Sequence, residues 1–278
     1  MSQKEKKNLK QKMGKWRTLF SVCLISGLLL LVRYYILSLN LDFISLNSLS
    51  SSIIASATFV AGFLLSGVFS DYKEVDKIPS EIRSLLESIL SEGDALVRKD
   101  QGFAENNFKL KMSILSFIKE FEDGLSHTND HSHIECALKE IKNFDVIFDD
   151  MERRGVPPNY MTRIKTEQSN LKKILLRVYH IQKTKFIPSV VLLVDSMIVL
   201  VVGLLLFVKT DWYIGFIELA IISFILLYSR KLIIILEKPF RKGNDDTEDD
   251  VSIFVLRELR YELENIFAKN NVKPKNFN

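Results

Sequence analysis

Charged residues are scarce in four long windows of the chain, although they make up 26% of the whole sequence. The windows are residues 17–39, 52–70, 186–208 and 212–236. About 20 mostly apolar residues in a helix cross the ~30 Å of hydrocarbon in a bilayer, and each window approaches or exceeds that length. The second window is rich in Ser, Ala and Gly but contains no charge. The pattern therefore predicts four transmembrane helices and an integral membrane protein.

Between the second and third windows, residues 71–185 show the periodicity of amphipathic helices. Apolar residues recur at intervals of three and four in several runs, which include Ile82, Leu85, Leu86, Ile89 and Leu90, then Leu110, Ile114, Leu115, Ile118 and Phe121. Residues 155–158, Gly-Val-Pro-Pro, end one such run. We therefore predict an all-α membrane protein with a large water-facing helical region, followed by an acidic turn and a C-terminal helix within residues 237–278.

The distribution of Lys and Arg predicts the topology, because basic segments are retained on the cytoplasmic side. Residues 1–17 contain seven such residues and residues 71–185 contain nineteen, against none in 40–51 and one in 209–211. We expect residues 1–16, 71–185 and 237–278 to be cytoplasmic, in the cell (plasma or inner) membrane. A cleaved signal peptide also fits a lysine-rich start, but no A-x-A-like site follows it.

The net charge of +4 needs no nucleic-acid partner. Basic flanks beside membrane helices attract anionic lipid, so the bilayer itself explains the excess. The sequence contains no nucleophile elbow, phosphate-binding Gly loop or His-Glu metalloprotease motif, and we do not expect an enzyme.

Arg33, Asp195 and Glu218 inside the predicted spans need a separate account, because ionisable groups there are costly and commonly functional. Arg33 and Glu218 are both expected near the outer leaflet, and we predict that they form an ion pair, with snorkelling of Arg33 as the alternative. Asp195 lies deeper, roughly 13 Å from the inner boundary at 1.5 Å per residue. The sequence suggests no partner for it, which indicates a hydrated vestibule or a protonated carboxyl.

Several motifs along the chain are similar to those of bestrophins. The second window contains Thr58-Phe59-Val60-Ala61-Gly62-Phe63 and ends at Asp71-Tyr72, which resembles the bestrophin neck helix. The third window begins with Ile187-Pro188, and the fourth is followed by Glu237-Lys238-Pro239-Phe240 and an acidic run. The chain thus resembles the bestrophin family of anion channels over its whole membrane architecture.

The resemblance implies a homo-oligomeric ring, a pentamer in that family, which conducts small anions such as chloride. Four residues spaced four apart share one stripe of the second predicted helix, namely Ala55, Phe59, Phe63 and Gly67. Around a symmetry axis the two phenyls would form successive rings of a hydrophobic neck, although packing against neighbouring helices remains open. The alternative function is a non-conducting scaffold or signalling protein whose residues 71–185 bind a partner.

Carboxylates cluster after the fourth window, at Asp245, Asp246, Glu248, Asp249 and Asp250. Their oxygens suit calcium, which makes calcium the one cofactor that the sequence suggests. The spacing does not match an EF-hand, and Thr247 to Asp250 also resembles a capping box for a helix over residues 251–269. A second cluster, His127, His131, His133 and Cys136, is expected in a solvated loop rather than a metal site.

Overall fold

The four windows with few charges form long helices in the computed structural model, which describes residues 3–45, 48–126, 132–183, 188–237 and 251–269. The membrane helices are α1 (Gln3–Ser38), α2 (Ser48–Asp76), α7 (Pro188–Phe207) and α8 (Trp212–Leu236). Stretches long and apolar enough to cross a bilayer lie in each of them: Thr18–Ser38, the uncharged part of Ser48–Lys99, Ser189–Phe207 and Tyr213–Leu236. The prediction of an all-α membrane protein with four spanning helices is confirmed.

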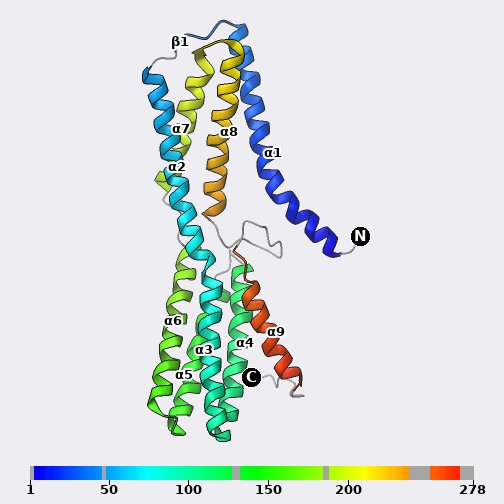
Figure 1. Cartoon of the computed structure of the whole chain (residues 1–278), viewed down its shortest axis with the longest axis vertical. Helices are drawn as coiled ribbons and strands as arrows, with labels where there is room; N and C mark the ends of the chain where they lie inside the picture. The colour runs from blue at the N-terminus through cyan, green and yellow to red at the C-terminus, as the bar shows by residue number, and fades with distance from the viewer. Residues whose placement is uncertain (1–2, 46–47, 127–131, 184–187, 238–250, 270–278) are drawn as a thin grey trace. The chain divides into compact units, whose positions relative to one another are not determined.

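The chain divides into two compact units. The first contains α1, α2 as far as Lys73, α7 and α8. Figure 1 shows α7 and α8 side by side, with α1 packed along α8. Two short strands, β1 (Ile44–Ser45) and β2 (Val208–Lys209), pair in parallel, with Ile44 opposite Val208 and Ser45 opposite Lys209. This pair of strands connects the segment after α1 with the C-terminal end of α7.

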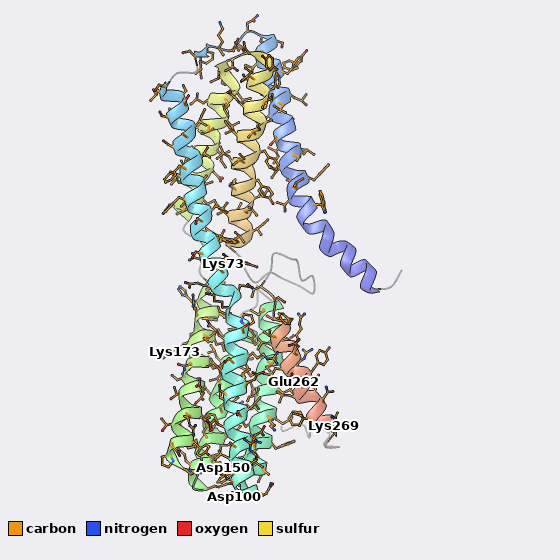
Figure 2. The ribbon with its side chains drawn as sticks, in the orientation of Figure 1. Lys73, Asp100, Asp150, Lys173, Glu262 and Lys269 are labelled. Carbon is orange, nitrogen blue, oxygen red and sulfur yellow. The ribbon has the colours of Figure 1, made fainter. Side chains whose placement is uncertain are left out.

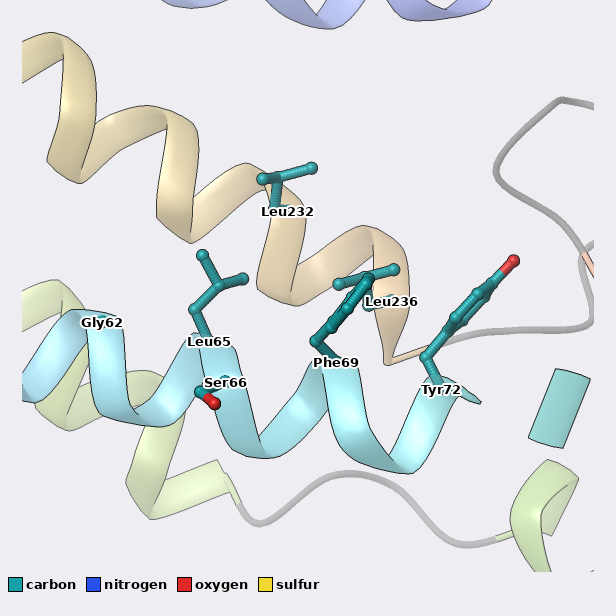
Figure 3. A pocket seen from close by; sticks show the side chains of 7 residues that line it. All are labelled: Gly62, Leu65, Ser66, Phe69, Tyr72, Leu232 and Leu236. Atoms are coloured by element: carbon teal, nitrogen blue, oxygen red, sulfur yellow. The ribbon is translucent and has the colours of Figure 1, made fainter. Parts of the chain in front are cut away.

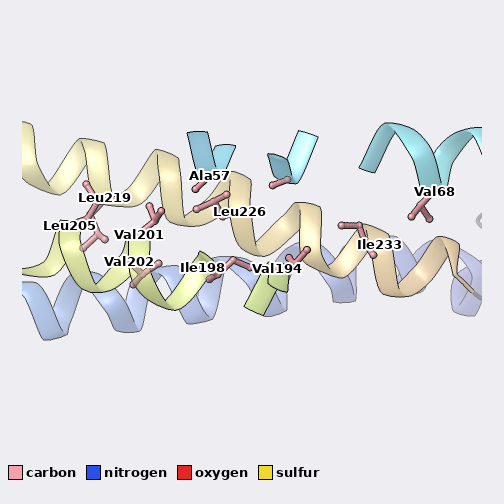
Figure 4. Packing of buried hydrophobic residues seen from close by; sticks show 11 residues of the cluster. Ala57, Val68, Val194, Ile198, Val201, Val202, Leu205, Leu219, Leu226 and Ile233 are labelled. Atoms are coloured by element: carbon pink, nitrogen blue, oxygen red, sulfur yellow. The ribbon is translucent and has the colours of Figure 1, made fainter. Parts of the chain in front are cut away.

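The core of the first unit is apolar and built from small and branched side chains. Ala57, Ala61 and Val68 of α2 are buried against α7 and α8 (Figure 4). The α7 and α8 side chains in this cluster are Val194, Ile198, Val201, Val202, Leu205, Leu219, Leu226 and Ile233. Helix association in lipid depends on such close van der Waals packing, since burial from water contributes little there.

The second unit contains the predicted water-facing helices. They are α3 (Ile78–Lys99), a short 3₁₀ turn η1 (Gln101–Phe103), α4 (Ala104–Ser126), α5 (Ser132–Arg153), α6 (Pro158–Lys183) and α9 (Phe254–Lys269). Helix α4 packs along α5, and α3 packs along α6, α4 and α9. The stripes seen in the sequence form the core, where Ile82, Ile114 and Phe144 are fully buried. Burial from water contributes about 1.5–3 kcal/mol for each such side chain.

The turn between α5 and α6 follows from local chemistry. Gly155 has φ +87°, a conformation that a side chain disfavours, and its N–H bonds the carbonyl of Glu152 at 3.0 Å. Pro158 then begins α6, where a missing N–H costs nothing. The sequence thus places the break between these two helices correctly.

Candidate functional site

The four-residue stripe of α2 lies on a face that the rest of the chain leaves uncovered. Ala55 and Gly67 are exposed, and Phe59 and Phe63 retain 73% and 70% of their accessible surface. The buried residues Ala57, Ala61 and Val68 occupy the opposite side of the same helix, as the 3.6-residue repeat requires. In one chain, therefore, the two phenyls do not pack against the chain's own membrane helices, and lipid, a pore or a second copy must meet them.

Arg33 of α1 is buried, with 1% of its surface exposed. Its guanidinium donates to the backbone carbonyls of Leu205, Leu206 at 3.3 Å and Val208 at 3.2 Å, and to the Thr210 hydroxyl at 3.0 Å. The last carbonyls of a helix have no partner inside the helix. Arg33 therefore caps the C-terminal end of α7, where the helix dipole also favours a cation.

Space for the guanidinium comes from Gly215. A Cβ on that residue would overlap the Arg33 guanidinium and the Thr210 hydroxyl, so close approach requires glycine here. Glu218, one turn further along α8, acts on Arg33 electrostatically, as does Asp42. The hydrogen bonds of the Arg33 guanidinium described above go to backbone and hydroxyl oxygens. The direct ion pair between Arg33 and Glu218 stays a prediction.

Asp195 has a partner that the sequence reading missed. Arg230 of α8 donates to both carboxylate oxygens, with Nη2 at 2.9 Å from Oδ2. Asp195 lies on α7, and the two side chains stay about one third exposed in the single chain. The expectation of an unpartnered acid is therefore corrected to an intramembrane ion pair that joins α7 to α8.

Two grooves flank α2. The first has a volume of about 500 Å³ and lies between α2 and α8 (Figure 3). Its lining residues are Gly62, Leu65, Ser66, Phe69, Tyr72, Leu232 and Leu236. The second, of about 340 Å³, lies between α2 and α7 and is lined by Ser52, Ile53, Ser56, Ala57, Ser196, Met197 and Leu200. The small residues that made the second window weak by hydropathy leave these spaces beside the helix.

In the second unit, charged contacts fix α9 against α3 and α4. Arg83 of α3 donates to Glu258 at 2.7 Å and to the Val255 carbonyl at 3.1 Å. Arg260 of α9 bonds Glu122 of α4. Beneath these contacts α9 buries an apolar face of Leu256, Leu259, Leu263 and Phe267.

The pKa values of two carboxyls of this unit, the buried Glu122 and the partly exposed Asp94, are shifted in opposite directions. Burial raises the pKa of Glu122, and the charges of Arg260 and Arg257 oppose that rise without cancelling it. Burial also acts on Asp94, but hydrogen bonds from Lys111 and Asn107 outweigh it and lower the pKa of that carboxyl.

Two neighbouring asparagines tie the start of α4 to its neighbours. The Asn107 amide donates to Asp94 of α3 at 2.6 Å, and the Asn106 amide donates to Asp150 of α5 at 2.7 Å. Figure 2 labels Asp150. Both asparagines are buried, so each amide–carboxylate bond also compensates the cost of removing polar groups from water. These contacts hold three helices of the unit in one arrangement.

The predicted calcium ligands Asp245, Asp246, Glu248, Asp249 and Asp250 lie outside the described residues, as do His127 and His131. Among the residues that the structure describes, no group of three or more His, Cys, Asp or Glu side chains could hold a metal ion. The proposed capping box, Thr247 to Asp250, also lies outside the described residues and stays a prediction. Helix α9 begins at Phe254, three residues after the expected start at 251, and Ile253 accepts its first bonds, from Leu256 and Arg257. Calcium binding stays a prediction.

No family model and no curated protein matches the sequence. Solved structures do match the fold. A variant of a membrane protein aligns with a TM-score of 0.68 and 14% identity, over 90% of this chain and 97% of the other. A bacterial bestrophin homologue from Klebsiella pneumoniae aligns with a TM-score of 0.66 and 14% identity, over 92% and 98%. A variant of a Klebsiella pneumoniae bestrophin homologue gives 0.67 and 14%, over 89% and 98%.

These alignments extend over nearly the whole of each chain, so they include the membrane helices and the second unit alike. At 14% identity they show a shared fold and carry no residue-level correspondence. The bestrophin resemblance first seen in short motifs is thus confirmed as a bestrophin-like fold.

Proposed function

We propose that the chain assembles as a ring of identical copies, in which α2 lines a central pore that conducts small anions. The observation that carries the proposal is the exposed stripe of α2 in a chain with a bestrophin-like fold. Phe59 and Phe63 are large apolar side chains that the chain's own helices leave uncovered, and no charge lies between residues 43 and 70. In a ring of copies, that face would line the pore.

The chemistry of the stripe suits anions. Phenyl rings carry positive edges, so two successive rings of phenyls can face an anion without a buried positive charge. A narrow apolar ring also resists wetting, which lets small changes in radius open or close the path. Ala55 and Gly67, one turn before and after the phenyls, leave a wider path on either side.

A five-fold ring is part of the proposal and rests on the family resemblance. Only a ring lets a single α2 per copy enclose a path, because one helix from a monomer or two from a dimer leave its sides open to lipid. Self-association and conduction are therefore separate steps, and each needs its own measurement.

The test is a flux measurement on purified protein in liposomes under a chloride gradient, with particle size determined on the same sample. Anion-selective flux from a ring-sized particle is expected. The absence of anion flux from a verified ring, with calcium and voltage both varied, contradicts the channel function. It favours the alternative in which residues 71–185 bind a partner. A monomer that conducts contradicts the central pore.

A further inference from the structure

The groove between α2 and α8 has the position and chemistry of a lipid site. Leu65, Phe69, Leu232 and Leu236 make its walls apolar, and Gly62 and Ser66 leave room along its floor (Figure 3). From Gly62 to Tyr72 the helix rises about 15 Å at 1.5 Å per residue. That length matches one leaflet, half of the ~30 Å hydrocarbon layer.

One end of the groove is polar. Tyr72 lies at the end opposite Gly62, and its hydroxyl points away from the apolar walls (Figure 3). Aromatic residues with a polar tip are typical of the boundary between hydrocarbon and headgroups. Tyr72 also comes directly after Asp71, the first charged residue beyond the uncharged stretch of α2, so both features place this end at the headgroup level.

A basic residue, Lys73, lies at that end. The Lys73 ammonium lies 4.6 Å from the ring centroid of Phe69, itself a wall of the groove. Among the described residues, Lys73 forms no ion pair with a carboxylate. Asp71 is two positions earlier, about 200° around the helix at 3.6 residues per turn, and so lies on the other side of α2.

We propose that this groove binds one acyl chain of an anionic phospholipid, with the lipid phosphate at Lys73. An apolar channel of one leaflet's length fits an acyl chain. The Lys73 ammonium, which pairs with no carboxylate of the described residues, selects a negative headgroup over a zwitterionic one. A second copy of this chain that covers the groove is the alternative outcome, and the experiments below distinguish it from lipid. The site does not depend on conduction, and its test measures binding alone.

The first experiment places a single reporter in the groove. Full-length protein with Trp16→Phe, Trp212→Phe and Phe69→Trp is reconstituted in vesicles of phosphatidylcholine and phosphatidylglycerol. Brominated acyl chains, which quench tryptophan, are carried by one lipid or the other at equal mole fraction. We expect an apparent affinity about fivefold higher for phosphatidylglycerol, the effect of one basic residue near the surface. Lys73→Gln is expected to abolish that preference.

A matched pair of variants tests the groove itself. Gly62→Leu fills the groove, whereas Gly203→Leu makes the same change on α7, and in the single chain neither added Cβ meets a neighbour. Quenching is expected to fall in the first variant and stay unchanged in the second. Equal quenching by both lipids in protein that retains Lys73 overturns the proposal. So does the absence of quenching by either lipid, which would show that a second copy covers the groove.

A second measurement does not require the tryptophan variant to fold. Mass spectrometry of the intact wild-type complex from detergent counts the phosphatidylglycerol that it retains. We expect retained lipid in wild-type and Gly203→Leu protein, and its loss in Gly62→Leu and Lys73→Gln. Wild-type protein that retains no lipid, or equal retention by all four, overturns the proposal.

Discussion

At the scale of single residues, the Arg33 guanidinium takes the place that water would have beside the last carbonyls of α7. Arg33→Met keeps much of the side-chain volume but leaves the carbonyls of Leu205 and Val208 without that donor. An unsatisfied buried polar group costs about 1–3 kcal/mol. We expect the thermal unfolding midpoint in detergent, followed by circular dichroism, to fall by about 2–12 °C.

Arg177→Met is the matched control for that measurement. Arg177 forms an exposed ion pair with Glu74 at 2.5 Å, and exposed pairs contribute about 0–1 kcal/mol. Equal losses in the two variants would contradict the capping role of Arg33. Gly215→Ala adds a second check, since the overlap that it creates with Arg33 should cost less when Arg33 is already replaced.

The Asp195–Arg230 pair makes a prediction of non-additivity. Asp195→Asn and Arg230→Gln each leave one charge without its partner in a membrane segment, which is costly. Replacing both removes the unpaired charge, so the double variant should be more stable than the sum of the single effects predicts. We expect a coupling of roughly 0.5–3 kcal/mol in a double-mutant cycle of unfolding free energies.

Additive effects in that cycle would mean that the two side chains do not stabilise each other. A useful comparison is the pair Arg83 and Glu87, which are one turn apart on the surface of α3. Its coupling should stay near 0.3–0.5 kcal/mol, the usual value for exposed pairs within a helix.

The missed partner of Asp195 could have been found from the sequence. Asp195 is seven residues after the start of α7, and Arg230 is six residues before the end of α8. In an antiparallel hairpin a rise of 1.5 Å per residue places both roughly 9–11 Å from the open end.

At the scale of elements, α2 presents three different faces. One packs on α7 and α8 through Ala57, Ala61 and Val68, one borders the groove toward α8, and one carries Phe59 and Phe63. The sequence predicts the transmembrane span, because an uncharged stretch of this length is typical of a membrane-crossing helix. It separates the faces only by spacing, since Ser, Ala, Gly and Phe are compatible with lipid, pore and helix contacts alike.

Helix α9 gives a prediction of pH dependence. Because burial raises the pKa of Glu122, the folded protein binds this proton more tightly than the unfolded chain. The Glu122 contribution to stability is therefore greatest below the ordinary value of 4.5 and is lost as pH rises through the raised pKa. Glu122→Gln keeps an acceptor for Arg260 but removes the titratable carboxyl. The thermal unfolding midpoint of this variant should therefore not show the decline above pH 4.5 that the Glu122 contribution causes.

The measurement is the thermal unfolding midpoint of the second unit between about pH 4 and pH 7. The midpoint of the variant is subtracted from that of wild type at each pH. Asp94→Asn provides a contrast of opposite sign. The lowered pKa of Asp94 means that its contribution is present above 3.8 and is lost at lower pH. A Glu122→Gln curve parallel to that of wild type would contradict the assignment.

At the scale of the whole molecule, local signals and distant contacts contribute differently. Hydropathy and periodicity predict the membrane helices and the helical region between them, because each signal is contained within one element. The docking of α9 on α3 and α4 depends on pairs such as Arg83 with Glu258 and Glu122 with Arg260, which are far apart in sequence. Periodicity gives α9 an apolar face but does not say which helices cover it.

The central pore makes the last prediction, on flux per ring in liposomes. If Phe59 and Phe63 form the narrowest apolar rings, Phe59→Ala with Phe63→Ala should widen the path and ease its wetting. A chloride flux raised roughly tenfold corresponds to a barrier lowered by about 1.4 kcal/mol. Phe20→Ala is the control, since Phe20 is equally exposed, at 69%, but lies on α1.

The control decides between a pore and a general loosening of the membrane helices. Flux that rises in the α2 variant and stays unchanged in Phe20→Ala, at equal ring size, places the barrier on α2. Equal changes in both variants, or none in a protein verified to conduct, would mean that the exposed phenyls meet lipid or neighbouring copies. The anion path would then have to run outside the stripe.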